Sequence, residues 1–335
     1  MLLVFLRYLQ HEMYPDYKAN RAEAPMDLIP QFGLIRRAAE AYGIAQVQAY
    51  TYEADDVIAT LATMALDSEL QDDTVIILSS DKDLMQLVTR PPTDAKTVSV
   101  DDPTNTLPLS STLVQMMDPM TMTLVDHDAV IEKWGVNASQ VGDVLALAGD
   151  SADNIPGVPG IGPKTAATLI SSFGSLDEIY KNLDQIPQAG RRTKLELNEE
   201  IARLSRRLVE LERNVPLGQI VFAENDEPVA PSGTLSLMDD LRLKPIDPKR
   251  ILDFYDEMGF DTIKRRLQQR LKQREQRLQR RSQKQGQQWQ KETHIVSDTE
   301  GYKSDNSNES SQPRKKFKPR ETRIPRPEDY KDVPF

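Results

Sequence analysis

The sequence predicts an α/β fold, with a mostly parallel sheet flanked by helices and a helical region after it. Helix and strand patterns alternate through residues 1–88, the order typical of α/β proteins. Val75–Leu78 is a continuous apolar run between polar residues, which is typical of a parallel strand buried on both faces. From His127 to about Leu271 the pattern is mostly helical. The length of 335 residues and the mean hydropathy of −0.53 fit one sizeable domain with polar extensions.

Local patterns predict the elements in turn. Ala24–Tyr42 has helical periodicity, with Pro25 near its start, where proline is tolerated, and Ala54–Ala65 has a second helical pattern. Between them, Ala45–Tyr50 is expected to form a strand. Residues 89–112 are rich in Pro, Ser, Thr and Asp without periodicity, so we expect a mobile surface insertion there.

The composition changes again toward the C-terminus. A stretch punctuated by Gly and Pro, Pro156–Pro163, and a Pro-rich loop near Glu227–Gly233 interrupt the helical pattern. Gln, Arg and Lys dominate after Leu271, and residues 272–292 are expected to form a solvated basic helix. Residues 293–335 carry too little apolar area to offset the entropy of ordering, so we expect them to be disordered.

The composition restricts the chemistry that the chain can perform. It has no cysteine, which removes thiolate chemistry, and its three histidines, His11, His127 and His294, are too scattered to favour a zinc site. Carboxylates remain as metal ligands, and they favour Mg²⁺ or Mn²⁺. No apolar run approaches the roughly 20 residues of a membrane span, so no membrane partner is expected.

Charge is distributed unevenly along the chain. The net charge is −10, yet residues 264–292 hold 11 Lys and Arg against 2 Glu, which leaves residues 1–263 at −20. A histone-like protein would be basic throughout, so this pattern disfavours that class. An acidic body with a basic segment suits a protein that collects carboxylates around metal and adds cationic contacts for a polyanion. A merely solvated helix explains the basic segment equally well.

Two groups of carboxylates follow expected strands. Glu53, Asp55 and Asp56 stand at the start of an expected helix, where acidic residues also serve as ordinary caps. Asp81 and Asp83 follow the apolar strand, and ligands of open α/β sheets lie beyond the carboxyl ends of strands. A polar turn that caps the next helix accounts for the second pair equally well. The residues alone leave open whether either group binds a ligand.

A third group of carboxylates has a more specific context. Asp150 and Asp153 lead into Ile155-Pro-Gly-Val-Pro-Gly-Ile-Gly-Pro-Lys-Thr-Ala166. This string predicts two helices joined by a hairpin, with Gly160-Ile-Gly162 in the turn and Lys164 and Thr165 at a helix start. Such a hairpin presents main-chain N–H groups and a cation to a phosphate.

The chain carries four motifs of one family in the family's order. They are Tyr14-Pro-Asp-Tyr17-Lys18-Ala-Asn-Arg21, Tyr52-Glu-Ala-Asp-Asp56-Val, Asp81-Lys-Asp83-Leu and Gly149-Asp-Ser-Ala-Asp-Asn-Ile-Pro-Gly-Val-Pro-Gly-Ile-Gly-Pro-Lys-Thr-Ala166. On these motifs the chain resembles the bacterial-type 5′→3′ exonuclease and flap endonuclease family, in its stand-alone form. That family includes the 5′-nuclease domain of DNA polymerase I and free-standing exonucleases of bacteria, phages and plant or algal organelles. The likeness covers about residues 8–271, interrupted by residues 89–112.

The resemblance implies a PIN-like nuclease domain over residues 1–125 and a helical subdomain over residues 126–271, with a helix-hairpin-helix at residues 156–170. It also implies two nearby divalent ions, because two metals about 3.5–4 Å apart activate water and neutralise charge on the attacking and leaving oxygens. By motif, Glu53, Asp55 and Asp56 would hold or orient the first ion. The second would be served, partly through water, by Asp81, Asp83, Asp150 and Asp153.

The resemblance also implies substrate contacts. Lys18 matches the family's catalytic lysine at the scissile phosphate and Arg21 its basic neighbour, although two nearby charges also fit a solvated helix face. Tyr17 is expected to stack on a base. The hairpin is expected to hold the downstream duplex backbone without reading its sequence, with K⁺ as a candidate ion there. The residues of the chain that match this role are Gly157, Gly160, Gly162, Lys164 and Thr165.

The N-terminus departs from the family pattern. Family members begin with a strand ending in Asp-Gly, which has no counterpart here, and continue with a strand ending in Phe-Asp. The second aspartate falls near Leu3, and a family arginine falls on Gln10. We therefore expect an N-terminally truncated member that lacks one strand and two metal-site aspartates.

The expected function is a Mg²⁺-dependent 5′→3′ exonuclease and 5′ flap endonuclease, acting on flap, nicked or RNA-primed DNA in Okazaki fragment processing and repair. The missing aspartates leave open a catalytically inactive DNA-binding or scaffolding member, whereas no groove-reading helix supports a transcription factor. We expect a monomer, in a plastid or mitochondrion if eukaryotic or in the cytoplasm if bacterial. Glu328–Phe335 resembles the acidic tip of bacterial single-stranded-DNA-binding proteins, so a replication partner at this tail is a further hypothesis.

Overall fold

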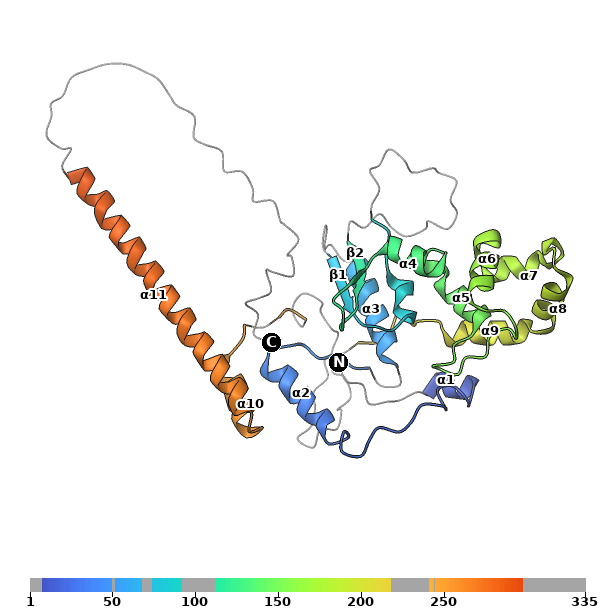
Figure 1. The fold of residues 1–335 in the computed structure, drawn as a ribbon, viewed down its shortest axis with the longest axis horizontal. Coiled ribbons are helices and arrows are strands. Elements are labelled where there is room, and N and C mark those ends of the chain that lie inside the picture. The colour runs from blue at the N-terminus through green and yellow to red at the C-terminus, as the bar shows by residue number, and fades with distance from the viewer. Residues whose placement is uncertain are drawn as a thin grey trace, which may run out of the picture. The chain divides into compact units, whose positions relative to one another are not determined.

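The computed structural model describes residues 8–49, 52–67, 74–91, 112–217, 241–243 and 245–297 (Figure 1). The chain divides into two compact units, Met1–Ile246 and Asp247–Phe335. The first unit contains a small sheet and most of the described helices. Nowhere in the described ranges is there a helix with both the length and the apolar character that crossing a bilayer requires.

The sheet of the first unit has three strands, β1 (Thr74–Leu78), β2 (Leu113–Met117) and β3 (Leu124–Val125), in that order. β1 and β2 are parallel, and β3 adds an antiparallel pair on the far edge of β2. Helix α3 (Ala54–Asp67) lies beside β1 and β2 in Figure 1, and the 3₁₀ helix η1 (Asp83–Leu87) follows β1. The expected α/β class and the helix expected at Ala54–Ala65 are thereby confirmed.

β1 is buried on one face and exposed on the other. Ile77 lies in the core, whereas Ile76 and Leu78 are 43% and 60% exposed. The expectation of a strand buried on both faces is therefore wrong for the described residues. The expectation rested on a short apolar run, and such a run does not reveal whether a second layer covers the strand.

The strand expected at Ala45–Tyr50 is absent over its described part, residues 45–49, which are irregular. Val47 and Ala49 are still buried, in a small core with Val57 and Val215. The alternating apolar side chains therefore pack inward, but a strand also needs a neighbour for its N–H and C=O groups. None of the three described strands pairs with this segment.

Helix α2 (Gln31–Ala41) is shorter than the helix expected at Ala24–Tyr42, and α1 (Tyr8–Met13) precedes it. Residues 26–30 form turns, and α2 begins directly after Pro30. A proline disfavours helical geometry at the residue before it, so Pro30 sets the start of the helix.

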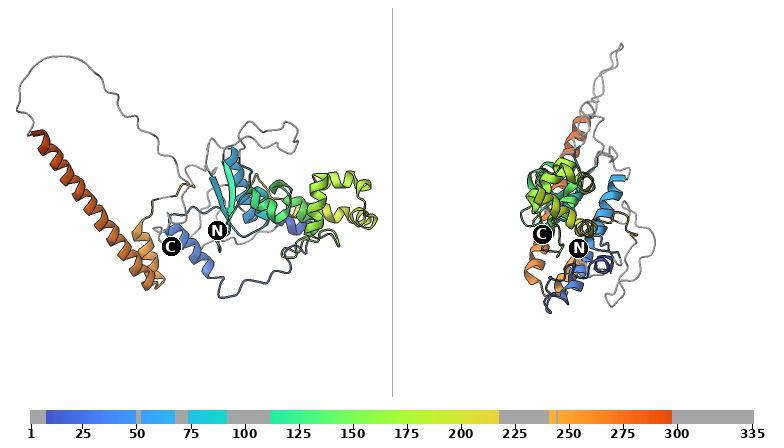
Figure 2. Two further views of the ribbon diagram at one scale, coloured as in Figure 1. Left: turned by 45° about the horizontal axis from the view of Figure 1, so that its top comes forward. Right: turned by 90° about the vertical axis from the view of Figure 1, so that its right-hand side faces the viewer.

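The helical part of the first unit shares a hydrophobic core with the sheet. Ile77 of β1, Leu145 and Ile170 belong to this one core. α5 packs against both α6 and α9, and these helices lie together in both views of Figure 2. The helices are α4 (His127–Trp134), α5 (Val141–Ala148), α6 (Pro163–Phe173), α7 (Leu176–Lys181), α8 (Ala189–Leu197) and α9 (Glu199–Leu208), with 3₁₀ turns η2 (Ala138–Gln140) and η3 (Leu183–Gln185).

The chain after α9 returns to α3. Thr60 Oγ1 in α3 accepts a hydrogen bond from the main-chain N–H of Val215 at 3.1 Å. The same hydroxyl donates to the C=O of Glu212 at 3.4 Å. The end of the helical part is therefore attached to the helix that carries the first carboxylate motif.

The second unit contains α10 (Pro248–Glu257) and α11 (Asp261–Ser297). The side chain of Asp247 caps α10 by accepting the N–H of Lys249 at 2.9 Å. The rings of Phe254, Tyr255 and Phe260 pack on one another, which joins the two helices.

Several expectations fall partly or wholly outside the described residues. The segment 272–292, expected as a basic helix, lies within α11. This helix continues to Ser297, so the expectation of disorder is wrong for residues 293–297. Most of the insertion at 89–112, the loop near 227–233 and residues 298–335 are not described. The mobile insertion, the Pro-rich loop and the docking tail therefore stay predictions.

Candidate active site

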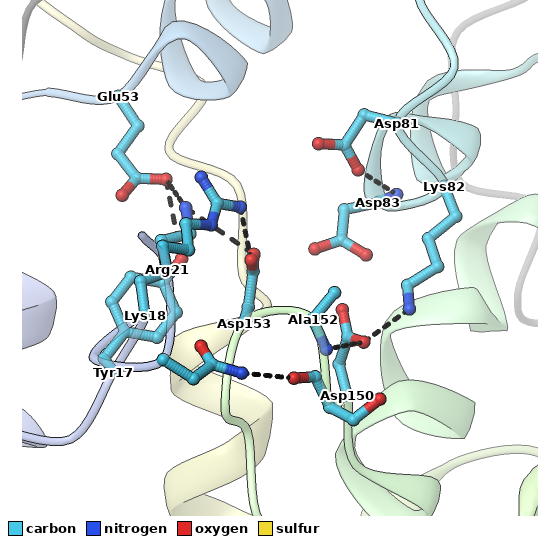
Figure 3. Close-up of polar contacts among 12 residues, drawn as sticks. Tyr17, Lys18, Arg21, Glu53, Asp81, Lys82, Asp83, Asp150, Ala152 and Asp153 are labelled. Atoms are coloured by element: carbon cyan, nitrogen blue, oxygen red, sulfur yellow. Dashed lines mark hydrogen bonds and ion pairs between the residues drawn. The ribbon is translucent and has the colours of Figure 1, made fainter. Parts of the chain in front are cut away.

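Three turns of the first unit bring the expected carboxylates together (Figure 3). Glu53 directly precedes α3, Asp81 and Asp83 follow β1, and Asp150 and Asp153 follow α5. Their side chains point toward one region although the turns lie far apart in the sequence.

Asp83, Asp150 and Asp153 form the tightest group. One carboxylate oxygen from each lies within 4.8 Å of the others, and all three side chains are buried. Asp81 Oδ1 accepts the N–H of Asp83 at 3.1 Å, and Asp150 Oδ1 accepts the N–H of Ala152 at 3.0 Å, which fixes both turns. Carboxylates at this separation repel one another unless a proton or a cation lies between them.

A lysine and an arginine lie beside this group. Lys18 is 5% exposed, and its Nζ lies 2.5 Å from Glu53 Oε2 and 3.6 Å from Asp153 Oδ2. Arg21 pairs with Asp153 Oδ1. The N–H of Lys18 also donates to the C=O of Asp153 at 2.9 Å, with Lys18 held at a φ of 56°. Lys18 is therefore a buried site residue, and the solvated-face interpretation is wrong for it.

Burial alters the ionisation of two of the carboxylates, Asp55 and Asp83. It raises the pKa of Asp55 and of Asp83 to about 7 each, with the nearby Asp81 charge as the next cause for both. Glu53 Oε1 and Asp83 Oδ1 are buried and accept no hydrogen bond from any residue that the structure describes. A buried, unpartnered carboxylate oxygen is costly without a cation. The donor set therefore fits a divalent ion that prefers oxygen ligands.

Asp56 is engaged differently from its neighbours. Its Oδ2 accepts the N–H of Glu53 at 3.1 Å, and its Oδ1 accepts the N–H of Glu212 at 2.9 Å. Both oxygens are thus occupied by the main chain. Asp56 therefore orients Glu53 and attaches the returning chain, and the expectation that it holds or orients an ion stays a prediction.

Lys82 is a site residue that the sequence reasoning missed. Its Nζ lies 2.6 Å from Asp150 Oδ1. Its position between two aspartates in Asp81-Lys-Asp83 was the available signal, because a turn after a strand brings successive side chains near one site.

Tyr17 does not have the role expected for it. Only 3% of the residue is exposed, and its ring belongs to the hydrophobic core. Burial raises the pKa of its hydroxyl far above the ordinary value, and the Glu53 charge adds to this, with Tyr17 Oη 3.5 Å from Glu53 Oε2. The expectation that Tyr17 stacks on a base is wrong, because a buried ring has no face to offer.

The hairpin divides into a buried and an exposed part. Gly157 is buried, its N–H donates to Ser205 Oγ at 3.1 Å, and a Cβ there would overlap main-chain atoms of Gly149. It therefore packs the hairpin, and the expectation that it contacts DNA is wrong. Gly160, Gly162 and Lys164 are exposed, and Thr165 is half-buried at the start of α6. Lys194 of α8, which the sequence reasoning missed, places its Nζ against Gly160.

Comparison with known families gives two matches along the chain. Residues 6–135 match the 5′-3′ exonuclease N-terminal resolvase-like domain, and residues 136–227 match the 5′-3′ exonuclease C-terminal SAM fold. Among curated relatives, DNA polymerase I of Rhizobium leguminosarum is 40% identical over 256 residues, which are 76% of this chain and 21% of that protein. DNA polymerase I of Bacillus caldotenax is 31% identical over 77% of this chain and 25% of its own length. The chain thus spans a quarter or less of these relatives.

Solved structures with a similar trace include two nucleic-acid enzymes. The T5 D15 protein, co-crystallised with metal ions, has a TM-score of 0.46 and 26% identity over 61% of this chain and 70% of its own. The catalytic core of Rad2 in complex with DNA has a TM-score of 0.39 and 14% identity over 74% of this chain and 69% of its own.

Proposed function

The chain belongs to the 5′-3′ exonuclease family, and we propose that it hydrolyses phosphodiester bonds in DNA as a 5′→3′ exonuclease and 5′ flap endonuclease. One observation carries the proposal: three buried carboxylates converge within 4.8 Å beside a buried lysine. Removal of 5′ flaps or RNA primers in replication and repair is the cellular role that suits this activity.

The carboxylates are proposed to hold divalent ions, Mg²⁺ or Mn²⁺. Asp83, Asp150 and Asp153 would hold one ion, because a carboxylate oxygen from each lies within 4.8 Å of the others, and Asp81 would serve the same ion. Glu53 with Asp55 would hold a second ion. Glu53 Oε1 and Asp83 Oδ1 have no hydrogen-bond partner among the described residues, and burial raises the pKa of Asp55 to about 7. Such ions, when bound, lower the pKa of water and neutralise charge on the attacking and leaving oxygens. Because Asp55 and Asp83 have pKa values of about 7, ion binding at neutral pH displaces protons from them.

Lys18 and Arg21 are proposed to contact the scissile phosphate. The Lys18 ammonium is held by Glu53 and Asp153 in a buried position, where a charged donor interacts with a phosphate oxygen more strongly than in water. Arg21, whose side chain is 44% exposed, pairs with Asp153 on the solvent side of the site. Lys18 and Arg21 would stabilise the negative charge that develops on the phosphate during hydrolysis.

The exposed part of the hairpin is proposed to hold the duplex backbone. Gly160, Gly162 and Lys164 leave main-chain N–H groups and an ammonium accessible at the start of α6, and Lys194 adds a second cation. Main-chain donors contact phosphates without reading bases, so this grip would be independent of sequence. K⁺ is a candidate ion at the same turn.

A family member that binds DNA without cutting it is the second candidate. It is favoured by the exposure of Ile76 and Leu78 on β1, the strand that leads into Asp81 and Asp83. An uncovered face next to the site would leave these turns less firmly held. Metal-dependent cleavage by the chain as given would eliminate this candidate.

The test uses a 5′-flap duplex labelled at its 5′ end, with the 335-residue chain in Mg²⁺ or Mn²⁺. We expect cleavage that Asp153→Ala and Asp81→Ala reduce roughly 100-fold or more. Asp128→Ala, an exposed carboxylate on α4, serves as the control and should cleave like the unaltered chain. Equal cleavage by all variants would show that these carboxylates are not the active site.

A further inference from the structure

Helix α11 lies beyond the residues that the family models match, and it is strongly basic. The models end at residue 227, whereas α11 runs from Asp261 to Ser297. Through Arg281 the helix carries nine Lys and Arg against two acidic residues, Asp261 and Glu275. Neither the sheet nor the carboxylate site accounts for this excess of positive charge.

Five arginines lie on one side of α11 and form a continuous row. Their separations are four, four, three and four residues, which keeps successive members on one face of an α-helix. The row is roughly 22 Å long, from fifteen residues at about 1.5 Å each. The members, named here the arginine row, are Arg266, Arg270, Arg274, Arg277 and Arg281, and all five are exposed.

The arginine row has no counter-charge of its own. Within the described part of the chain, none of its members takes part in a hydrogen bond or an ion pair, whereas Lys264 pairs with Asp256 at 2.5 Å. Neighbours three and four residues apart on a helix interact, so each arginine faces another arginine along the row. An ordinary solvated helix intersperses both signs of charge, and this face does not. A ligand that carries a row of negative charges would relieve the repulsion.

We propose that the arginine row is a second nucleic-acid-binding site, which holds the sugar–phosphate backbone of a duplex without reading its sequence. Guanidinium groups match phosphate oxygens in a bidentate geometry, and a DNA strand presents a phosphate about every 3.4 Å along its axis. The row is a line of planar donors with the length of several such phosphates. The site does not depend on cleavage at the carboxylates.

The test measures binding of the full chain to a blunt duplex without a flap, in EDTA, across a series of salt concentrations. Each phosphate contact contributes about 0.9 to the slope of log K against log salt. R270Q/R274Q is therefore expected to reduce the magnitude of the slope by about 1.8, and the variant with all five arginines changed to Gln by about 4.5. The matched control, R265Q/K272Q, removes two charges from another face of α11 and should leave the slope nearly unchanged.

Two further measurements keep folding and specificity under control. Helix content by circular dichroism should stay unchanged, and an Arg→Lys version of the row should keep the slope while binding more weakly, because lysine lacks the bidentate fork. Equal slopes for R270Q/R274Q and R265Q/K272Q would overturn the proposal. It would also be overturned if the row variants kept DNA binding but lost binding to vesicles of phosphatidylcholine and phosphatidylserine.

The outcome is separable from that of the proposed nuclease function. The Asp153→Ala chain in EDTA should show the same salt slope as the unaltered chain, since the row lies on a helix of the other unit. A chain that loses flap cleavage but keeps the slope has lost only the carboxylate site. If the unaltered chain never cleaves the flap but R270Q/R274Q reduces the salt slope of DNA binding, the result supports the arginine row and not the nuclease function.

Discussion

Replacing Asp83 by asparagine is expected to stabilise the metal-free protein at pH 8, although Asp83 is a proposed metal ligand. Burial raises the pKa of Asp83 from 3.8 to about 7, with the Asp81 and Asp150 charges as lesser causes. At pH 8 the folded chain must keep a buried charge that the unfolded chain exposes to water. The difference between these pKa values corresponds to about 4 kcal/mol in the free energy of unfolding at pH 8. We expect Asp83→Asn to raise the free energy of unfolding by about 2 kcal/mol only, because the neighbouring carboxylates can take up a proton in place of Asp83.

The direction of the pH dependence follows from proton binding by the two states. Below pH 3.8 both the folded and the unfolded chain hold the proton on Asp83, so this group adds nothing to the pH dependence. As pH rises from 3.8 to about 7, the unfolded chain releases its proton first, and the free energy of unfolding falls. Above about pH 7 the loss is complete. Asp55, whose pKa is raised to about 7 mainly by burial, acts in the same direction.

The assay is urea unfolding in EDTA at an acidic and an alkaline pH. At pH 8 the Asp83→Asn chain should resist urea better than the unaltered chain, and the advantage should vanish near pH 4. Asp128→Asn, on the exposed side of α4, is the control and should differ from the unaltered chain by less than about 0.5 kcal/mol at either pH. Excess Mg²⁺ should reverse the order, because only the complete ligand set gains full stability from the ion. An Asp83→Asn chain no more stable than the unaltered one at pH 8 in EDTA would refute the reasoning.

Three other changes test the site and the packing. Lys18→Ala should lower single-turnover flap cleavage roughly 100-fold by removing a buried charged donor, and unchanged cleavage would place the catalytic cation elsewhere. Gly157→Ala should cost about 3 kcal/mol in urea unfolding, because its φ is 60° and a Cβ would meet main-chain atoms; Gly162→Ala, with open space around it, should change stability by less than about 0.5 kcal/mol. Ile170→Ala, in the shared core, should cost about 3 kcal/mol, whereas Leu197→Ala, which is exposed, should cost less than about 0.5 kcal/mol; equal losses would contradict the burial described.

The family resemblance predicted that Asp83, Asp150 and Asp153 serve one site, whereas their positions along the chain left ligand binding open. The three carboxylates do converge in the structure. The sequence predictions were wrong for the faces of β1 and for the ring of Tyr17. Both errors concern burial, which depends on what the rest of the chain places against a residue. The local sequence pattern does not contain that information.

The contacts of two lysines were also missed. Lys82 forms an ion pair with Asp150, and Lys194 Nζ lies against Gly160, so both contacts join segments that are distant in sequence. The position of Lys82 between two aspartates indicated that it lies at the site, but it did not identify Asp150 as the partner. The strand expected at residues 45–50 shows another limit. Val47 and Ala49 are buried, but a strand also requires a neighbouring strand, which the sequence pattern does not specify.

Asp56 and Thr60 of α3 each form a hydrogen bond with the main chain of Glu212, which lies 156 and 152 residues away in the sequence. These two contacts hold the ends of the segment 56–212 together. The hairpin and the turns after β1 and α5 lie within this segment, and Glu53 lies just before it. A duplex that restricts the motion of the hairpin would therefore also restrict the motion of Glu53 and the start of α3. Thermodynamic linkage makes such an effect mutual: a divalent ion must tighten duplex binding by the same factor by which the duplex tightens ion binding.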